Sequence, residues 1–354
     1  MSGSAIHLDF TLPLLQWYEQ HGRKGLPWQH PRDPYRVWIS EVMLQQTQVK
    51  TVLPYFTRFI DSFPDLSSLA LAAEDEVLAH WSGLGYYSRA RNMHKTAKII
   101  ANELDGKFPE SLPELIKLPG IGDSTAGAIA SLAFNKPTAI LDGNVKRVLS
   151  RYFLVSGLAE QSAVKKKLWA LANECMPDTA CADYTQAIMD LGATCCTVNN
   201  PLCSSCPLQK TCLAYQGHVV ASYPSKKLKK KLPVKQQQFL LLHTVDNLIY
   251  LEKNPPIGLW GGLWCMPSID INHCPHAYIT QTYQLHADKV QDLMTIKHSF
   301  SHFHLHIKAL SLQTSTLTYS LAELPGRWFS VSELKKLGLA KPVSVIINQF
   351  LHTI

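Results

Sequence analysis

The feature that most constrains the fold of this chain is a short loop with four closely spaced cysteines, Cys196, Cys203, Cys206 and Cys212. Their spacing is C-x6-C-x2-C-x5-C. Four thiolates this close can enclose one metal centre, either a zinc ion or an iron–sulfur cluster. Zinc ribbons usually carry two C-x2-C pairs that a longer stretch separates, whereas this loop has one such pair. Cys195 precedes the first cysteine directly and leaves the identity of the first ligand open.

Length and composition indicate more than one globular domain. The chain has 354 residues, of which 46% are hydrophobic, and this is more than one core usually absorbs. No apolar run approaches the ~20 residues that a membrane helix needs. Met1–Gln16 lacks the pattern of a secretory signal, so we expect a protein of the cytoplasm and nucleoid. The net charge of +7 is compatible with a polyanionic partner.

The periodicity of apolar residues divides the chain. From Thr11 to about Leu191 apolar residues recur at intervals of three and four, and Gly- and Pro-containing turns interrupt the run. Beyond Gln236 the period shifts toward two, as in Phe303–Leu310, before a helical pattern returns over Ser332–Leu351. We therefore expect an all-α domain over 1–217, which includes the cysteine loop 196–212, a linker over 218–235, and a small α+β domain over 236–354.

The expected linker is basic. It contains Lys226, Lys227, Lys229, Lys230 and Lys231. Such a run favours a solvated spacer between domains, and the alternative is a spacer that also contacts phosphates.

A possible phosphate-binding hairpin lies at Leu118–Gly122, with the sequence LPGIG, followed by the helical run Asp123–Ala130. Two glycines allow a tight turn, and the N–H groups at the start of the second helix can face a phosphate. This pattern resembles a helix–hairpin–helix motif. A plain connection between two helices is the alternative.

Two carboxylates stand out. Asp142 lies directly before a helical run, where its ordinary role is an N-cap and its alternative role is a catalytic carboxylate. Glu41 shares a helix face with Trp38, Val42 and Gln45, so it points toward packed or cleft surface. Loss of solvation there would raise the pKa of Glu41 and make it a usable acid near neutral pH.

Taken together, these motifs resemble the MutY adenine DNA glycosylases of the endonuclease III superfamily. The blocks Leu26–Trp28, Pro34–Gln48 and Gly83–Arg91 precede the hairpin, and Leu141–Arg147 follows it, in the family's order over about the first 215 residues. The resemblance implies an all-α helix–hairpin–helix glycosylase domain with a [4Fe–4S] cluster in the cysteine loop. It also implies that the partner is double-stranded DNA with adenine opposite 8-oxoguanine or guanine, bound by a monomer.

The resemblance also assigns roles to matching positions. Glu41 would protonate adenine at N7, and Asp142, supported by Asn144, would stabilise the positively charged sugar. Gln186 would read the flipped adenine. The other positions expected to contact DNA or the base are Trp28, Gln45, Gln46, Tyr86, Gly120, Gly122 and Ser124.

One departure bears on the reaction. Ser124 stands where the lyase members of the superfamily carry a nucleophilic lysine, so we expect base removal without strand cleavage. Asp123 replaces the basic residue often found after the hairpin and should weaken the phosphate contact there.

The C-terminal segment Gly258–Pro267 looks like the opening of a Nudix fold, but no R-E-x-x-E-E helix follows it. A binding domain is therefore expected instead of a hydrolase. Within it, Phe300, Ser301 and His302 lie between two β-patterned segments, and the resemblance implies that they read 8-oxoguanine.

Three other functions were weighed against this one. An endonuclease III-like pyrimidine glycosylase with lyase activity conflicts with Ser124 and with the Nudix-like segment. A noncatalytic DNA-binding redox sensor conflicts with Glu41 and Asp142. Hydrolysis of nucleoside diphosphates conflicts with the missing acidic helix.

Overall fold

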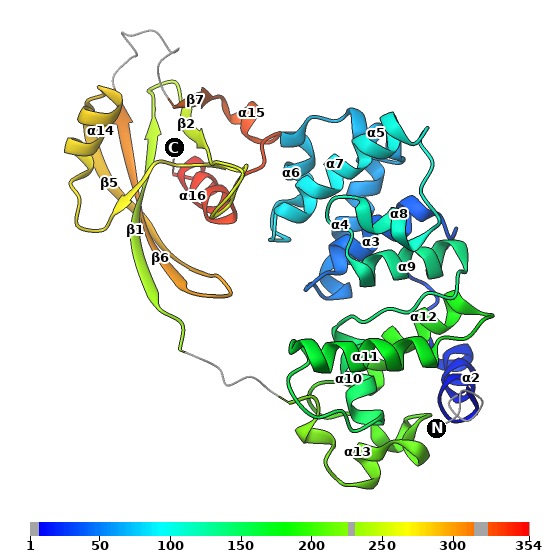
Figure 1. The fold of residues 1–354 in the computed structure, drawn as a ribbon. Helices are drawn as coiled ribbons and strands as arrows, with labels where there is room; N and C mark the ends of the chain where they lie inside the picture. The colour runs from blue at the N-terminus through cyan, green and yellow to red at the C-terminus, as the bar shows by residue number, and fades with distance from the viewer. Residues whose placement is uncertain (1–6, 226–230, 315–324, 354) are drawn as a thin grey trace. The chain divides into compact units, whose positions relative to one another are not determined.

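The structure is a computed structural model that describes residues 7–225, 231–314 and 325–353 (Figure 1). The chain forms two compact units, Met1–Ala70 with Lys95–Lys229, and Leu71–His94 with Lys230–Ile354. Lys226, Lys227, Lys229 and Lys230 of the expected linker lie outside the described residues. In the described part of the chain, no helix is both long and apolar enough to cross a membrane.

The segment from His7 to Ser225 contains helices and no strand, as the apolar periodicity predicts. Short η segments occur at η1 (His7–Thr11), η2 (Leu191–Cys195), η3 (Cys203–Ser205), η4 (Gln209–Thr211) and η5 (Val220–Ser222). The α-helices are α2 (Leu12–His21), α3 (Pro34–Leu44), α4 (Val49–Ser62), α5 (Leu66–Leu71), α6 (Glu74–Trp81), α7 (Ser88–Glu103), α8 (Leu112–Lys117), α9 (Asp123–Phe134), α10 (Gly143–Tyr152), α11 (Ser162–Cys175), α12 (Cys181–Asp190) and α13 (Leu213–Gln216).

Helix α9 is central to the N-terminal unit. It packs against both α3 and α12, and α12 also packs against α2. Its small residues, such as Ala126 and Ala130, are fully buried and let the neighbouring helices approach closely. A buried apolar cluster that includes Phe10, Leu149 and Ile188 holds η1, α10 and α12 together. This packing fixes the starts of α9 and α10 relative to α3 and α12.

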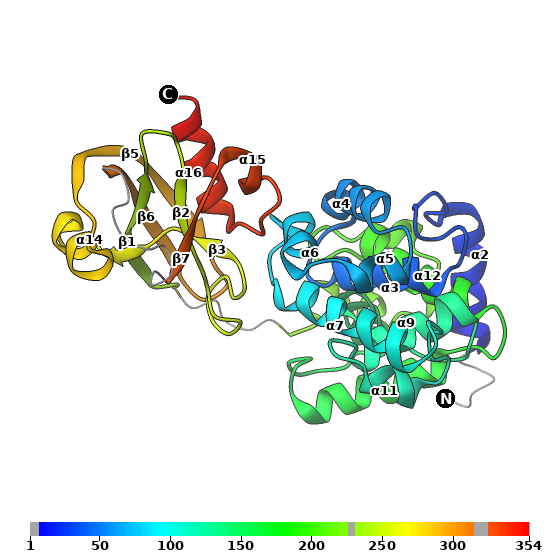
Figure 2. The same ribbon diagram turned by 90° about the horizontal axis from the view of Figure 1, so that it is seen from above.

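The C-terminal part forms a mixed sheet in the order β3-β2-β1-β6-β5, with β4 paired to β1 and β7 to β2. Only β1 and β6 run parallel among the described strands. Helices α14 and α16 lie on opposite sides of the sheet (Figure 2). The bounds are β1 (Val234–His243), β2 (Ile249–Lys253), β3 (Trp264–Cys265), β4 (Ser268–Asp270), α14 (Pro275–Tyr283), β5 (Ala287–Ser299), β6 (His304–Thr314), β7 (Gly326–Phe329), α15 (Val331–Leu334) and α16 (Lys341–Leu351).

The alternation predicted for Phe303–Leu310 is confirmed. Phe303, Leu305 and Ile307 are buried, whereas His304 and His306 are partly exposed. The first half of β6 therefore presents its apolar side chains on one face, as a period of two requires.

The helical pattern expected over Ser332–Leu351 is broken into α15 and α16. Between them the Gly338 carbonyl accepts a hydrogen bond from Trp264 N (2.9 Å). A side chain at Gly338 would lie 2.6 Å from Cβ of Leu78, so this position requires a residue without a side chain. The contacts of Gly338 with Trp264 and Leu78 join residues far apart in the sequence, so local periodicity could not predict them.

The unit boundaries differ from the expected division at residue 217, because Leu71–His94 groups with the C-terminal part. Within that unit Ser82 Oγ donates to the Leu339 carbonyl (3.1 Å), and Lys253 pairs with Asp75 (2.7 Å). Arg91 donates to the carbonyls of Pro256 and Gly261.

Candidate active site and cysteine loop

The two carboxylates come from different helices of the N-terminal unit. Glu41 lies within α3, partly buried beside the buried Trp38 and Val42. Asp142 is the N-cap of α10, as its position predicts: Oδ1 accepts from Val145 N (2.7 Å) and Oδ2 from Asn144 Nδ2 (3.0 Å). Both oxygens of Asp142 are thus held by donors at the start of the helix.

The environments of these two carboxyl groups differ. Loss of solvation, and then the negative charge of Asp142, raise the pKa of Glu41 to about 8. Burial also raises the pKa of Asp142, but Val145 N–H, Asn144 and the Arg147 guanidinium oppose that rise. Glu41 is therefore suited to carry a proton near neutral pH, whereas the donors at the start of α10 stabilise the anion of Asp142.

Arg147 holds this arrangement in place, a role that the sequence motif did not reveal. Its Nη2 donates to Asn144 Oδ1 (2.9 Å) and to the Gly192 carbonyl (2.6 Å), and its Nε donates to the Cys196 carbonyl (2.7 Å). Because a guanidinium only donates, Asn144 must turn its oxygen toward Arg147 and its NH2 toward Asp142. The chain of contacts links the cysteine loop to Asp142.

A pocket in the same unit holds Gln186. Its lining includes Trp28, Val37 and Gln186, from the loop before α3, from α3 and from α12. Trp28 is buried, and its ring meets Phe56 edge-on at 5.2 Å between centroids. Val37 lies one helical turn before Glu41, so the two residues share a face of α3.

The hairpin has the backbone that its glycines predict. Gly120 adopts φ +79°, a left-handed conformation that favours glycine, and Gly122 is the N-cap of α9. Ser124 Oγ accepts from Leu141 N (3.1 Å), so this side chain ties α9 to the segment before Asp142.

The end of α3 carries two further expected site residues. Gln45 donates through Nε2 to Thr125 Oγ1 (3.2 Å) and so links α3 to α9. Gln46 follows with φ +59°. Tyr86, which belongs to the other compact unit, has φ +50° and is about half exposed at 49%.

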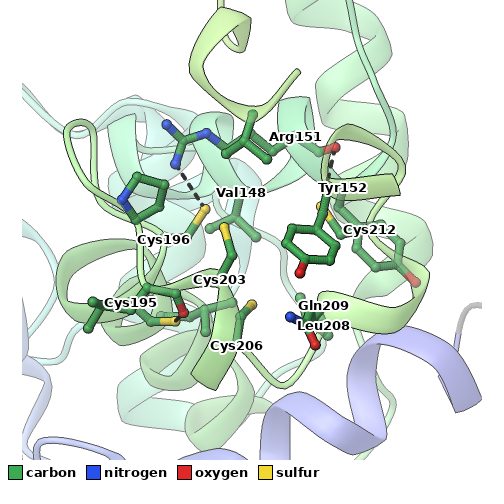
Figure 3. Close-up of a pocket in the computed structure, with 15 residues that line it drawn as sticks. Val148, Arg151, Tyr152, Cys195, Cys196, Cys203, Cys206, Leu208, Gln209 and Cys212 are labelled. Carbon is green, nitrogen blue, oxygen red and sulfur yellow. Dashed lines mark hydrogen bonds between the residues drawn. The ribbon is translucent and has the colours of Figure 1, made fainter. Parts of the chain in front are cut away.

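The four cysteines of the loop line one cavity, together with Cys195, Arg151 and apolar residues (Figure 3). Arg151 Nη1 donates to Cys196 Sγ (3.3 Å), whereas Cys195 Sγ donates to the Leu202 carbonyl (3.3 Å). Among the described side chains, no group of three or more Cys, His, Asp or Glu could hold a metal ion. The thiols thus surround a space instead of meeting at one point.

The C-terminal site residues lie in the tight connection between β5 and β6. Phe300 contacts Phe303 and Trp260, with ring centroids 4.7 and 5.2 Å apart. Ser301 and His302 are exposed and hydrogen-bond each other (3.3 Å). The aromatic contacts support a loop tip at which these two polar side chains are exposed.

Comparison with known proteins agrees with this organisation. Residues 39–174 match the family of HhH-GPD superfamily base excision DNA repair proteins, and residues 238–349 match the NUDIX domain family. The adenine DNA glycosylase of Buchnera aphidicola subsp. Schizaphis graminum (strain Sg) is 40% identical over 96% of this chain and 98% of that protein. The adenine DNA glycosylase of Mus musculus is 34% identical over 96% of this chain and 78% of that protein.

Solved structures match the helical part. A thermostable thymine-DNA glycosylase aligns with a TM-score of 0.55 at 28% identity, over 61% of this chain and 100% of that chain. A trapped endonuclease III–DNA covalent intermediate aligns with a TM-score of 0.52 at 21% identity, over 62% and 99%, which shows a shared fold. Because the identity to curated relatives extends over nearly the whole length, this chain belongs to the MutY family of adenine DNA glycosylases, within the endonuclease III superfamily.

Proposed function

We propose that this protein removes adenine opposite 8-oxoguanine, and opposite guanine, from double-stranded DNA by hydrolysis and without a lyase step. The observation that carries the proposal is the pair of Glu41, whose pKa is raised to about 8, and Asp142, which is held by donors at the start of α10. The two relatives compared above, both named adenine DNA glycosylase, support adenine as the base.

The chemistry requires an acid at the base. Adenine leaves poorly as an anion, so Glu41 delivers its proton to N7 as the bond from N9 to the sugar breaks. The resulting carboxylate then accepts a proton from the water that attacks the sugar. One positioned acid typically contributes roughly 10²–10⁴-fold to such a rate.

The sugar becomes positively charged as adenine leaves, and Asp142 stabilises that charge. A carboxylate that already accepts two hydrogen bonds is a weak base, so it suits electrostatic stabilisation more than proton transfer. Asn144 keeps the Asp142 carboxylate oriented through its NH2 group.

Access to the bond requires the base to leave the duplex, which costs a few kcal/mol. We assign the hairpin amides at Gly120 and Gly122 to a phosphate, and Trp28 to the wall of the base pocket. We also assign Gln45, Gln46 and Tyr86 to contacts with the DNA at the place where the base leaves the duplex.

For the cysteine loop we propose a [4Fe–4S] cluster held by Cys196, Cys203, Cys206 and Cys212. The four cysteines line one cavity, as the ligands of a shared cluster must, and the Arg151 contact favours Cys196 over Cys195 as the first ligand. When bound, the cluster braces the loop that carries Lys210. Phe300, Ser301 and His302 would read the 8-oxoguanine.

The absence of a lyase step rests on Ser124. Its hydroxyl is engaged with Leu141 N, and a serine offers no amine for a Schiff base.

A single-turnover assay on a duplex with one adenine opposite 8-oxoguanine tests the proposal, with and without hot alkali after the quench. We expect strand breaks only after alkali. Breaks without alkali would contradict the Ser124 argument, and no breaks from cluster-loaded protein would contradict glycosylase activity itself.

A further inference from the structure

The pocket that Trp28, Val37 and Gln186 line contains two glutamine side chains whose amide groups cannot be reversed. The pocket has about 370 Å³ of empty space, and Gln29 and Gln186 both line it. A side-chain amide has a donor NH2 and an acceptor oxygen of similar shape. If the amide can turn by about 180°, it can pair with either a donor or an acceptor and does not distinguish between ligands. Here the partner of each amide fixes its direction.

The direction of Gln186 is set by Asp190, one helical turn later on α12. Gln186 Nε2 donates to Asp190 Oδ1 (2.9 Å), and Asp190 is also bound by Arg23 through its backbone N–H (2.7 Å) and its guanidinium. An Asp190 carboxylate in an ion pair only accepts, so the NH2 of Gln186 must face it. Gln186 Oε1 has no hydrogen-bond partner among the described residues and remains available to a ligand.

The direction of Gln29 is set by the backbone. Leu26 N donates to Gln29 Oε1 (3.1 Å), and a backbone N–H cannot accept, so the NH2 of Gln29 must face the other way. Gln29 Nε2 is buried and has no hydrogen-bond partner among the described residues. A buried donor without a partner is unfavourable, so it is expected to have a ligand when the site is filled.

We propose that Gln186 and Gln29 form a fixed acceptor–donor pair that selects adenine: Gln186 Oε1 accepts from the N6 amino group, and Gln29 Nε2 donates to N1. Asp190 is then a positioning residue, because it acts through Gln186. The inference rests on the proposed function, since it concerns how the base is distinguished once adenine is the substrate.

The assignment follows from the order of groups around the base. Glu41 is assigned to N7, the N6 amino group lies next to N7, and N1 lies beyond it. Hypoxanthine and guanine carry an oxygen at C6 and a hydrogen on N1, so they reverse both groups that the pair would meet. With these bases an acceptor, Gln186 Oε1, would face the oxygen at C6, and a donor, Gln29 Nε2, would face the hydrogen on N1. Polar sites reject close analogues through such unpaired buried groups.

The first test compares Gln29→Met with the wild-type protein on two substrates, adenine and 1-deazaadenine, each opposite 8-oxoguanine. Single-turnover release of adenine should slow about three- to tenfold in the variant, as for loss of one hydrogen bond. Release of 1-deazaadenine, which has a C–H in place of N1, should be the same in both proteins. Gln20→Met, at an exposed glutamine of α2, is the matched control and should leave both rates unchanged.

The second test uses Asp190→Asn, which allows the Gln186 amide to reverse. The rate of adenine release divided by the rate of hypoxanthine release should fall by about three- to tenfold, because one hydrogen bond no longer distinguishes the two bases. A purely structural role for Asp190 would slow both bases equally and leave the ratio unchanged. Asp178→Asn, at an exposed position before α12, controls for loss of a negative charge.

The outcomes separate the inference from the proposed function. If the wild-type protein releases no adenine, the proposed function fails. If it releases adenine, but Gln29→Met slows adenine and 1-deazaadenine by the same factor, the assignment of Gln29 to N1 is overturned while the function stands. Circular dichroism and duplex affinity of each variant show whether the fold is retained.

Discussion

At the scale of single residues, the site depends on two carboxyl groups with opposite tasks. Glu41 is partly buried on α3, and its carboxyl group accepts no hydrogen bond from the described residues, whereas Asp142 accepts two. The same burial that makes ionisation of Glu41 unfavourable keeps a proton available for the base. The rate of base release and the free energy of unfolding should therefore both depend on pH through the titration of Glu41.

The rate of base release should fall as the pH rises through about 8, because Glu41 loses the proton that it donates. Well above this value the single-turnover rate should drop about tenfold for each pH unit, as for a single essential acid. Single-turnover rates of base release from about pH 6 to about pH 10 test this prediction, because that range brackets the titration of Glu41. A rate that stays constant across this range would show that protonated Glu41 is not required.

Replacement of Glu41 by Gln should abolish base release and stabilise the fold at pH 7. The folded-state pKa of Glu41 lies above its unfolded value, so between about pH 4.5 and 8 the native state binds the extra proton. Stability from this group is full below the unfolded pKa and is lost as pH rises toward the folded pKa. The gain in free energy of unfolding should reach at most about 3 kcal/mol at pH 7.

Urea unfolding of both proteins at pH 5 and pH 7 measures this difference. The gain should be much smaller at pH 5, where Glu41 is still protonated in the native state and only partly ionised in the unfolded state. An equal gain at both pH values would point to packing instead of proton linkage.

At the scale of secondary-structure elements, the start of α10 is held against η2. Gly192 of η2 packs directly on Asn144: a Cβ at Gly192 would lie 2.5 Å from Cβ of Asn144. The Gly192 carbonyl also accepts from Arg147, which itself binds Asn144 Oδ1. The close approach of these two elements is what fixes Asn144 beside Asp142.

Gly192→Ala should therefore displace Asn144 and slow base release by about 10- to 100-fold, since small misplacements of catalytic groups are costly. Single-turnover rates measure this, with iron content and circular dichroism as checks on the loop and the fold. Gly25→Ala is the control, because a Cβ there meets no atom within 4 Å. A Gly192→Ala rate equal to that of the control would mean that Asn144 tolerates displacement.

Sequence patterns anticipated the local features of these elements and missed the contacts between them. The N-cap at Asp142 and the turn at Gly120 could be predicted because each depends on a few neighbouring residues. The roles of Arg147 and Asp190 could not, since their partners lie in segments brought together only by packing. The break near Gly338 was missed for the same reason.

At the scale of the whole molecule, one compact unit is built from two distant parts of the sequence. Leu71–His94, within the helical half of the sequence, groups with Lys230–Ile354. Leu78 lies close to Gly338 and Gly262, and Ser82 and Arg91 donate to carbonyls of the C-terminal part. Removal of the C-terminal domain should therefore affect the helices of Leu71–His94.

Deletion of residues 231–354 should consequently loosen α6 and the start of α7 while leaving α9 and α10 intact. The deletion removes apolar cover from Leu78 and leaves Arg91 without its carbonyl partners, whereas α9 and α10 are packed within the other unit. Hydrogen–deuterium exchange of the truncated and full-length proteins measures this: amides of 74–94 should exchange at least about tenfold faster, the signature of a local stability loss of about 1.4 kcal/mol or more. Uniform acceleration over all helices would instead indicate global destabilisation, and no change over 74–94 would show that this segment is stable without the C-terminal domain.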